Sequence, residues 1–138
     1  TTAPTAVSPL PTRRASRLVS PLPPHPTSVE TYYKPEHLPR FGEIAEGSKP
    51  LADAFFSYYG KVFEDGALTA REKALIALAV AHTVQCPYCI DAYTQESLAK
   101  GSDLEQMTEA VHVATAIRGG ASLVHGLQML DGVKAQTM

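Results

Sequence analysis

Residues 68–101 read LTAREKALIALAVAHTVQCPYCIDAYTQESLAKG, and this stretch decides the fold of the chain. It begins with the capping box Thr69-x-x-Glu72, in which a hydroxyl and a carboxylate satisfy free backbone N–H groups. The centre is apolar almost all round, which predicts a buried helix over residues 68–85. Proline is favoured at the first position of a helix, so Pro87 predicts that a second helix begins at the CPYC sequence.

The segments on either side of this stretch are predicted to be helical as well. The last of them opens with a second capping box, Ser102-x-x-Glu105, and contains the pair Gly119-Gly120, which predicts a break, a kink or a very close helix contact. Strand signals are weak throughout, so we predict an all-α domain. The predicted helical segments besides 68–85 are 31–47, 50–66, 87–101 and 102–130.

The composition is ordinary for a soluble globular protein. Of the 138 residues, 44% are apolar and 19% are charged, and the formal net charge of -2 gives no indication of binding to nucleic acid or to a membrane surface. No apolar run approaches the roughly 20 residues of a membrane-spanning helix, and no secretory signal peptide is visible. Two cysteines are too few for a secreted disulfide framework, so we expect a reducing compartment, the bacterial cytoplasm.

The composition changes sharply near residue 30. Residues 1–29 contain seven prolines and three arginines but no acidic residue, which predicts an extended or disordered arm before a helical domain at 30–138. A solvated tail is the first interpretation of this arm. Because the rest of the chain is acidic, docking of the basic arm on a neighbouring subunit or another protein is the alternative. A start that contains arginine and serine and lacks acids also resembles an organellar transit peptide, which would place the protein in an organellar matrix.

Cys86 and Cys89 are the only cysteines of the chain, and their spacing suits redox chemistry. With Pro87 as the first helical residue, Cys86 lies near the N-cap and Cys89 lies about one turn into the helix, so the two sulfurs face the same side and can form a disulfide. The N-terminus of a helix favours thiolate over thiol and lowers a cysteine pKa from ~8.5 toward neutrality. The thiolate is the form that attacks peroxides and disulfides.

Two other interpretations of the cysteine pair remain open. A structural zinc site takes four ligands, usually from two such pairs, and this chain has one pair. Cys86 and Cys89 with His82 and a further histidine would make a mononuclear site, and two inert buried cysteines are the other alternative. Our prediction includes neither a metal nor a cofactor.

Residues 68–126, LTAREKALIALAVAHTVQCPYCIDAYTQESLAKGSDLEQMTEAVHVATAIRGGASLVHG, resemble the carboxymuconolactone decarboxylase-like superfamily on its alkylhydroperoxidase D-like side. The resemblance covers about residues 30–130, and its most specific part is an apolar helix followed by CPYCIDxxT. With ETYYKPEHLPRFGEI at residues 30–44, the chain is similar to the peroxidase-like proteins associated with arsenosugar biosynthesis. The resemblance implies an alkylhydroperoxidase D-like helical bundle that assembles into homo-oligomers, often trimers or hexamers.

The resemblance also implies a CxxC that cycles between dithiol and disulfide. In alkylhydroperoxidase D-like proteins the second cysteine is regarded as attacking the peroxide and the first as resolving the sulfenic acid. Carried over to this chain, Cys89 attacks and Cys86 closes the disulfide. The position at the helix end favours Cys86 as the more acidic thiol, so the two arguments differ.

The chain departs from the peroxidase pattern at both positions of the proton relay. The pattern has a histidine four residues after the second cysteine, where this chain has Tyr93. It has a glutamate twelve residues before the first cysteine, where this chain has Ala74. Tyrosine, with a pKa near ~10, is a poor base at neutral pH, but Tyr93 can donate a hydrogen bond to a peroxide or to a leaving hydroxide.

Two residues are candidate substitutes for the missing relay. Glu72 lies two positions from Ala74 but about 200° round the helix, and as the capping-box acid it has a structural role. His82 lies four residues before Cys86 and is a candidate base or thiolate partner, although a core or surface histidine is an equal alternative.

These residues predict a thiol-dependent peroxidase or disulfide oxidoreductase with an incomplete proton relay. Its substrate is a hydroperoxide or a protein disulfide, and another protein re-reduces it. Two alternatives need no base: a non-enzymatic oligomer that keeps the CxxC for structure and holds a partner, and a vicinal dithiol that binds trivalent arsenic. Decarboxylation of a lactone acid, which the superfamily name suggests, would need no CxxC, and no arginine–histidine constellation for such a substrate is visible.

Overall fold

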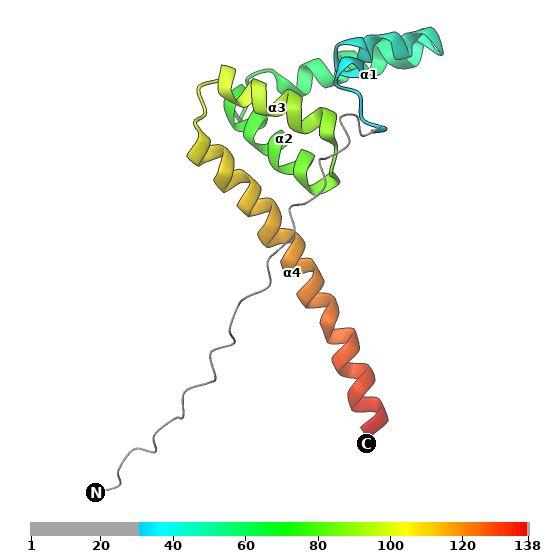
Figure 1. The fold of residues 1–138 in the computed structure, drawn as a ribbon, viewed down its shortest axis with the longest axis vertical. Helices are drawn as coiled ribbons and strands as arrows, with labels where there is room; N and C mark the ends of the chain where they lie inside the picture. Colours follow the sequence, from blue (N-terminus) through cyan, green and yellow to red (C-terminus); the bar gives the residue numbers. More distant parts are fainter. Residues whose placement is uncertain (1–30, 138) are drawn as a thin grey trace, which may run out of the picture. The chain divides into compact units, whose positions relative to one another are not determined.

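The computed structural model describes residues 31–137, which form five helices (Figure 1). This range contains no strand, so the predicted all-α fold class is confirmed. None of the helices in it combines the length and apolar character that crossing a membrane requires. The predicted arm at 1–29 lies outside the described residues. The helices are the 3-10 helix η1 (Pro35–Glu46) and the α-helices α1 (Lys49–Phe63), α2 (Ala70–Val84), α3 (Pro87–Ala99) and α4 (Leu104–Thr137).

Helix α2 is the centre of the packed part of the structure, because α3 and α4 both pack against it. Its predicted capping box is present. The Thr69 hydroxyl accepts the Glu72 N–H at 3.1 Å, and the Glu72 carboxylate accepts the Thr69 N–H at 2.7 Å. Ala74, Leu78 and Ala81 follow at helical spacing, and each is at most 2% exposed. The predicted helix is therefore found, but only this face of it is buried, since Ile76 and Val80 are 50% and 53% exposed in the single chain.

A left-handed turn joins α2 directly to α3. Gln85 adopts φ 56° and ψ 46°, a conformation that residues other than glycine rarely take. The N–H of Cys86 then donates to the Ala81 carbonyl at 3.1 Å, the bond that closes a Schellman-type helix end. Cys86 is also the N-cap residue of α3, so this turn fixes the first cysteine at a helix N-terminus.

Aromatic side chains connect η1, α1 and α3. The rings of Phe41 in η1 and Phe56 in α1 are 5.0 Å apart, and the ring of Phe63 in α1 stacks on Tyr93 in α3 at 5.2 Å. Phe55 and Tyr59 continue the series of ring contacts along α1. The helix predicted at 50–66 is found as α1, whose aromatic side chains contact η1 and, through Tyr59 and Phe63, Tyr93 of the CxxC helix.

The start of α4 differs by one residue from the prediction. The Gln106 N–H donates to Asp103 Oδ1 at 2.8 Å, and the Asp103 N–H donates to Gln106 Oε1 at 3.1 Å. The capping box predicted for Ser102 and Glu105 is therefore wrong. Ser102 is 5% exposed, and its N–H donates to the Ser97 carbonyl at 2.9 Å, so it belongs to the turn after α3 and does not cap α4.

Helix α4 is continuous over 34 residues and runs through Gly119-Gly120 (Figure 1). The break predicted at this pair is wrong, and residues 31–137 of the single chain form no close helix contact there. A Cβ added to either glycine would meet no atom of the structure within 4 Å. Glycine weakens a helix by about 1 kcal/mol relative to alanine, and the good helix formers on both sides carry the helix through.

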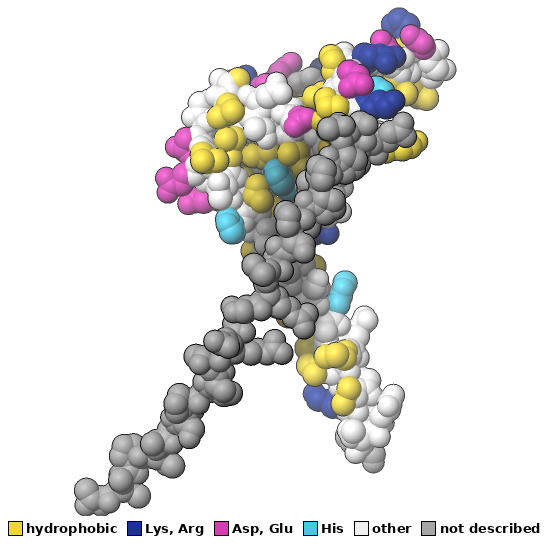
Figure 2. All heavy atoms as spheres, in the orientation of Figure 1, with side chains coloured by type: hydrophobic (Ala, Val, Ile, Leu, Met, Phe, Trp, Pro, Cys, Tyr) yellow, Lys and Arg dark blue, Asp and Glu magenta, His cyan; other side chains and the backbone are white. Residues whose placement is uncertain are grey.

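The C-terminal half of α4 carries many exposed apolar side chains, some of which appear in yellow on the lower part of the molecule in Figure 2. Arg118 links the middle of the helix to α2, because its Nη1 donates to the Thr83 carbonyl at 2.8 Å. Beyond this point the helix stands clear of the other helices (Figure 1). Its large exposed apolar residues are Leu123, Val124, Leu127, Met129, Leu130 and Val133.

Candidate functional site

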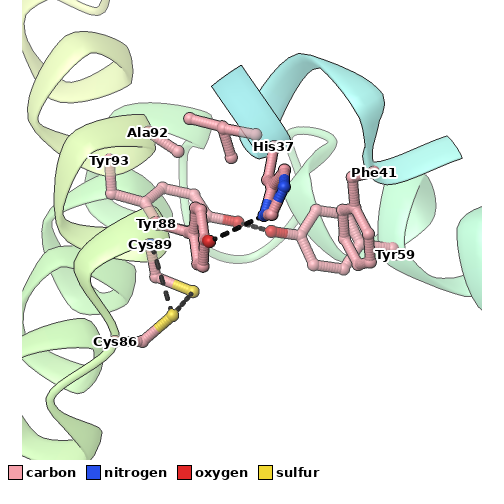
Figure 3. A pocket seen from close by; sticks show the side chains of 9 residues that line it. His37, Phe41, Tyr59, Cys86, Tyr88, Cys89, Ala92 and Tyr93 are labelled. Atoms are coloured by element: carbon pink, nitrogen blue, oxygen red, sulfur yellow. Dashed lines mark hydrogen bonds between the residues drawn. The ribbon is translucent and has the colours of Figure 1, made fainter. Parts of the chain in front are cut away.

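The two cysteines lie at the start of α3 with their sulfur atoms side by side (Figure 3). Cys86 Sγ accepts the Cys89 N–H at 3.4 Å, and the two Sγ atoms share a hydrogen bond at 2.9 Å. A disulfide has an S–S distance of about 2.05 Å, so oxidation needs the sulfurs to approach by less than about 1 Å. The pair can therefore form a disulfide with little movement of the backbone.

The two thiols differ in their surroundings. Burial, and then the hydrogen bond with Cys86, raise the pKa of Cys89 to about 11, so Cys89 holds its proton at neutral pH. Cys86 accepts a backbone N–H at the positive end of α3, which stabilises negative charge on its sulfur.

Both cysteines border an apolar cavity of about 380 Å³ at the junction of η1, α1 and α3 (Figure 3). A cavity of this size accommodates a small organic molecule. Its wall is mostly aromatic and aliphatic, with a few hydroxyl groups and one imidazole. The lining residues are His37, Leu38, Phe41, Tyr59, Cys86, Tyr88, Cys89, Ala92 and Tyr93.

A second apolar groove, of about 490 Å³, reaches the site from the side of α1 and α2. Cys89 and Tyr93 border both spaces, since they lie on α3 between them. Most of the rest of its wall comes from α1, with Val62 and Phe63, and from α2, with Ile76, Val80 and Val84. Cys89 can thus be approached from two directions.

Tyr93, the residue at the histidine position of the peroxidase pattern, is held by α1. Its hydroxyl is hydrogen-bonded to the hydroxyl of Tyr59, and its ring stacks on Phe63 with an interplanar angle of 25°. Burial, and then the hydrogen bond with Tyr59, raise the pKa of Tyr93 well above its ordinary value. Tyr93 therefore stays protonated and can act as a hydrogen-bond donor but not as a base.

Ala74, the residue at the glutamate position of the pattern, lies in the core of the protein. It is 0% exposed on the inner face of α2. A carboxylate at this position would be buried, and an unpaired buried charge is strongly destabilising. The packing around Ala74 therefore suits a small apolar residue and not the acid of a proton relay.

The two candidate substitutes do not line either space beside the cysteines. Glu72 forms the capping box at the far end of α2, roughly 20 Å along the helix from Cys86, and its hydrogen bonds with Thr69 lower its pKa. His82 Nδ1 lies 2.8 Å from the carbonyl oxygen of Leu78 in its own helix. A catalytic role for Glu72 or His82 stays a prediction without a supporting contact.

No group of three histidine, cysteine, aspartate or glutamate side chains between residues 31 and 137 is arranged to hold a metal ion. The mononuclear site considered for Cys86, Cys89 and His82 is therefore not formed by these residues.

The structure adds a histidine that the sequence did not point to. His37, in η1, lines the same cavity as the two cysteines, and its Nδ1 lies 3.2 Å from the hydroxyl oxygen of Tyr88, the residue between them (Figure 3). Tyr33, just before η1, is hydrogen-bonded to Asp91 on α3. The only hint in the sequence was the concentration of tyrosine and histidine in TYYKPEH at residues 31–37.

Comparisons with known proteins agree with this fold. A protein of the cox locus of Paracoccus denitrificans is 41% identical over 95 residues, which cover 67% of this chain and 86% of that protein. A crystal structure from Methanobacterium thermoautotrophicum matches 62% of this chain and 97% of its own, with a TM-score of 0.60 and 30% identity.

A crystal structure of a carboxymuconolactone decarboxylase family protein from Legionella pneumophila matches 75% of this chain and 97% of its own, with a TM-score of 0.55 and 26% identity. The model of the carboxymuconolactone decarboxylase family matches residues 49–132, which include α1, α2, α3 and most of α4. The narrower likeness to arsenosugar-associated proteins stays a prediction. The chain belongs to the carboxymuconolactone decarboxylase family.

Proposed function

We propose that the protein is a thiol-dependent peroxidase-like oxidoreductase that reduces hydroperoxides through a Cys86–Cys89 dithiol–disulfide cycle. The observation that carries this proposal is the pair of sulfur atoms 2.9 Å apart at a helix N-terminus, on the border of an apolar cavity. The close pair supports fast disulfide formation, and the cavity supports binding of a small organic hydroperoxide beside it. Membership of a family that the sequence placed near the alkylhydroperoxidases is compatible with this activity.

The cycle balances with the two thiols and one peroxide. A thiolate attacks the outer peroxide oxygen, the O–O bond breaks, and an alcohol and a sulfenic acid form. The second thiol attacks the sulfenic sulfur, water leaves, and the disulfide closes. The resemblance assigns the attack to Cys89, whereas the hydrogen bonds of the site favour the thiolate on Cys86.

Return to the dithiol needs two electrons from another thiol. We propose a protein reductant that exchanges thiolates with the Cys86–Cys89 disulfide, in a reducing compartment such as the cytoplasm. Both cysteines are half-buried and not sealed from solvent, which supports access by a partner. The same exchange run in reverse would reduce a protein disulfide, the other substrate class that we predict.

The test is stopped-flow oxidation of the fully reduced protein by hydrogen peroxide and by cumene hydroperoxide, with loss of free thiol as the readout. We expect a rate well above that of free cysteine and one Cys86–Cys89 disulfide per chain as the product. The Cys86→Ser/Cys89→Ser double variant is the control for thiol-independent loss of peroxide. A rate no greater than that of free cysteine would contradict the proposal.

Binding of a trivalent arsenical is a second candidate function for the same dithiol. The replacement of both relay residues by Tyr93 and Ala74 favours it, because chelation by two thiolates needs no base. Titration of the reduced protein with phenylarsine oxide tests it, with single-serine variants as controls for a two-thiol chelate. Slow peroxide reduction together with tight, dithiol-dependent binding would support this function in place of the first.

We also propose that the protein works as a homo-oligomer, with the C-terminal half of α4 in the interface. Leu123 and Leu127 are 80% and 56% exposed in the single chain, and exposed apolar patches of this kind mark interaction surfaces. Sedimentation velocity of the wild type and of Leu127→Glu tests this, with Leu104→Glu at the other end of α4 as the control. We expect a trimer or hexamer that Leu127→Glu dissociates, and a monomeric wild type would contradict it.

A further inference from the structure

The segment that leads into η1 holds the first turn of α3 through Tyr88 and Asp91. The ring of Tyr33 lies 4.7 Å from the ring of Tyr88 in an edge-on arrangement, and the Tyr33 hydroxyl is hydrogen-bonded to the Asp91 carboxylate. The backbone N–H of Lys34 donates to the Tyr88 hydroxyl oxygen at 3.3 Å. These contacts fix the Tyr88 side chain, which stands between the two cysteines in the sequence.

His37 completes the surroundings of the Tyr88 hydroxyl. Its Nδ1 lies 3.2 Å from that oxygen, and the imidazole and phenol rings are roughly parallel, with an interplanar angle of 25°. His37 is exposed on its other side, so it can exchange protons with solvent. It also borders the cavity that both cysteines border (Figure 3).

The number of donors around the Tyr88 hydroxyl decides what its proton can do. A phenol has one O–H to donate and accepts through its lone pairs. The Lys34 N–H takes one acceptor position. When His37 Nδ1 carries a hydrogen, it donates to the phenol oxygen, and the Tyr88 O–H is left to donate to a group in the cavity. When Nδ1 is bare, Tyr88 donates to His37 instead.

The pair can therefore pass one proton from solvent to the cavity, and we propose that this is its role. We infer that Tyr88, backed by His37, protonates the oxygen that leaves the peroxide, in place of the relay whose two positions hold Tyr93 and Ala74. This inference rests on the proposed peroxidase function. Tyr88 is the proton donor at the reacting oxygen, and His37 is a positioning residue that acts through it.

A cysteine thiolate attacks the outer oxygen of the hydroperoxide, the S–O bond forms, and the O–O bond breaks. The sulfur is oxidised by two electrons to a sulfenic acid, and the peroxide oxygens are reduced. The inner oxygen leaves as an alkoxide and takes the Tyr88 proton. Tyr88 then takes the Nδ1 hydrogen of His37 in its imidazolium form, and His37 becomes a neutral imidazole with its hydrogen on Nε2. His37 regains a proton from water.

The other polar groups near the sulfurs are less able to supply this proton. The Tyr93 hydroxyl is hydrogen-bonded to Tyr59. Glu72 and His82 do not border the cavity. His37 and Tyr88 are the pair in this cavity that joins an exposed imidazole to a phenol held next to the cysteines.

The test compares two peroxides that differ in the group that leaves. An alkoxide, released from tert-butyl hydroperoxide, is a strong base and needs a proton, whereas acetate, released from peracetic acid, is a weak base and does not. The variants are Tyr88→Phe, His37→Gln and the double variant, and His112→Gln, an exposed histidine on α4, is the matched control. Thermal unfolding followed by circular dichroism checks that each variant is folded.

We expect Tyr88→Phe and His37→Gln to slow thiol oxidation by tert-butyl hydroperoxide about 100-fold, the lower end of the usual contribution of a general acid. The double variant should be no slower than Tyr88→Phe, because the two residues act as one unit. Oxidation by peracetic acid should change by less than about threefold. If Tyr88→Phe does not fold, His37→Gln by itself provides the test.

The outcomes separate this inference from the proposed function. A wild type that reacts with both peroxides no faster than free cysteine overturns the peroxidase function itself. A fast wild type with variants that are equally fast overturns only the proton-donor inference. Equal slowing with both peroxides overturns it as well, because it shows that the two residues shape the site and do not protonate the leaving oxygen.

Discussion

The hydroxyl groups of Tyr59 on α1 and Tyr93 on α3 are hydrogen-bonded to each other. Tyr93 occupies the position at which the peroxidase pattern has a catalytic histidine, yet its hydroxyl is turned to a neighbouring helix. Burial raises its pKa, so it cannot accept a proton from a thiol at neutral pH. The hydrogen bond to Tyr59 thus makes Tyr93 a residue that links α3 to α1 at the border of the cavity.

Tyr93→Phe tests this assignment. We expect the rate of oxidation by cumene hydroperoxide to stay within about threefold of the wild type, and the free energy of unfolding to fall by about 1 kcal/mol through loss of one hydrogen bond. Tyr59→Phe, which removes the other hydroxyl of the same bond, should behave alike. Stopped-flow kinetics and urea unfolding measure the two effects, and a tenfold slower oxidation in Tyr93→Phe alone would assign it a catalytic role.

Single-cysteine variants decide which sulfur is the thiolate. Burial is the main cause of the raised pKa of Cys89, and it stays in place in Cys86→Ser. Alkylation of Cys89 by iodoacetamide should therefore be slow at pH 7, and its rate should rise toward a plateau well above pH 9. The alkylation rate rises with pH because the pKa of Cys89 is raised, so its reactive thiolate forms only as the pH approaches that pKa.

In Cys89→Ser, the remaining Cys86 keeps its place at the N-terminus of α3, so we expect faster alkylation at pH 7 than in Cys86→Ser. Trapping of a sulfenic acid with dimedone after one equivalent of peroxide then identifies the attacking cysteine. The resemblance predicts trapping in Cys86→Ser, and the hydrogen bonds of the site predict it in Cys89→Ser. Equal alkylation rates in the two variants would contradict the expectation that the N-terminus of α3 makes Cys86 the more reactive thiol.

The left-handed turn at Gln85 predicts a stabilising substitution. Gln85 has φ 56°, where a side chain is disfavoured and glycine is not, so Gln85→Gly should raise the free energy of unfolding by about 0.5–1 kcal/mol. Gly101, with φ 82° after α3, is the matched control, and Gly101→Ala should lower stability by a similar amount. Thermal melts measure both, and a lower melting temperature in Gln85→Gly would contradict this reading of the turn.

A buried hydroxyl predicts a second stabilising change. Ser97 is 0% exposed, and its Oγ has no hydrogen-bond partner among residues 31–137. Ser97→Ala removes this polar group and has a higher helix propensity, so we expect stability to increase by about 1 kcal/mol. Ser122→Ala is the control, because that exposed hydroxyl donates to the Arg118 carbonyl. A large loss of stability in Ser97→Ala would show that the hydroxyl has a partner in solution.

The local sequence was sufficient wherever a feature depends on neighbours within one turn of helix. The box of Thr69 and Glu72 and the start of α3 at Pro87 were predicted correctly, because both use contacts between residues one turn apart. The same reasoning failed at Ser102, where burial in the turn after α3 moved the cap of α4 to Asp103. The break predicted at Gly119-Gly120 is also absent, since a helix of 34 residues tolerates two residues of low helix propensity.

The sequence by itself determined an all-helical chain with two cysteines one turn apart at a helix N-terminus, because helix periodicity, caps and the CxxC spacing are local properties. Only the tertiary structure decided what surrounds the sulfurs. It joined Tyr93 to Tyr59 and brought His37 to Tyr88, 51 positions away. These contacts join separate helices, and no local pattern encodes them, because they depend on how η1, α1 and α3 pack together.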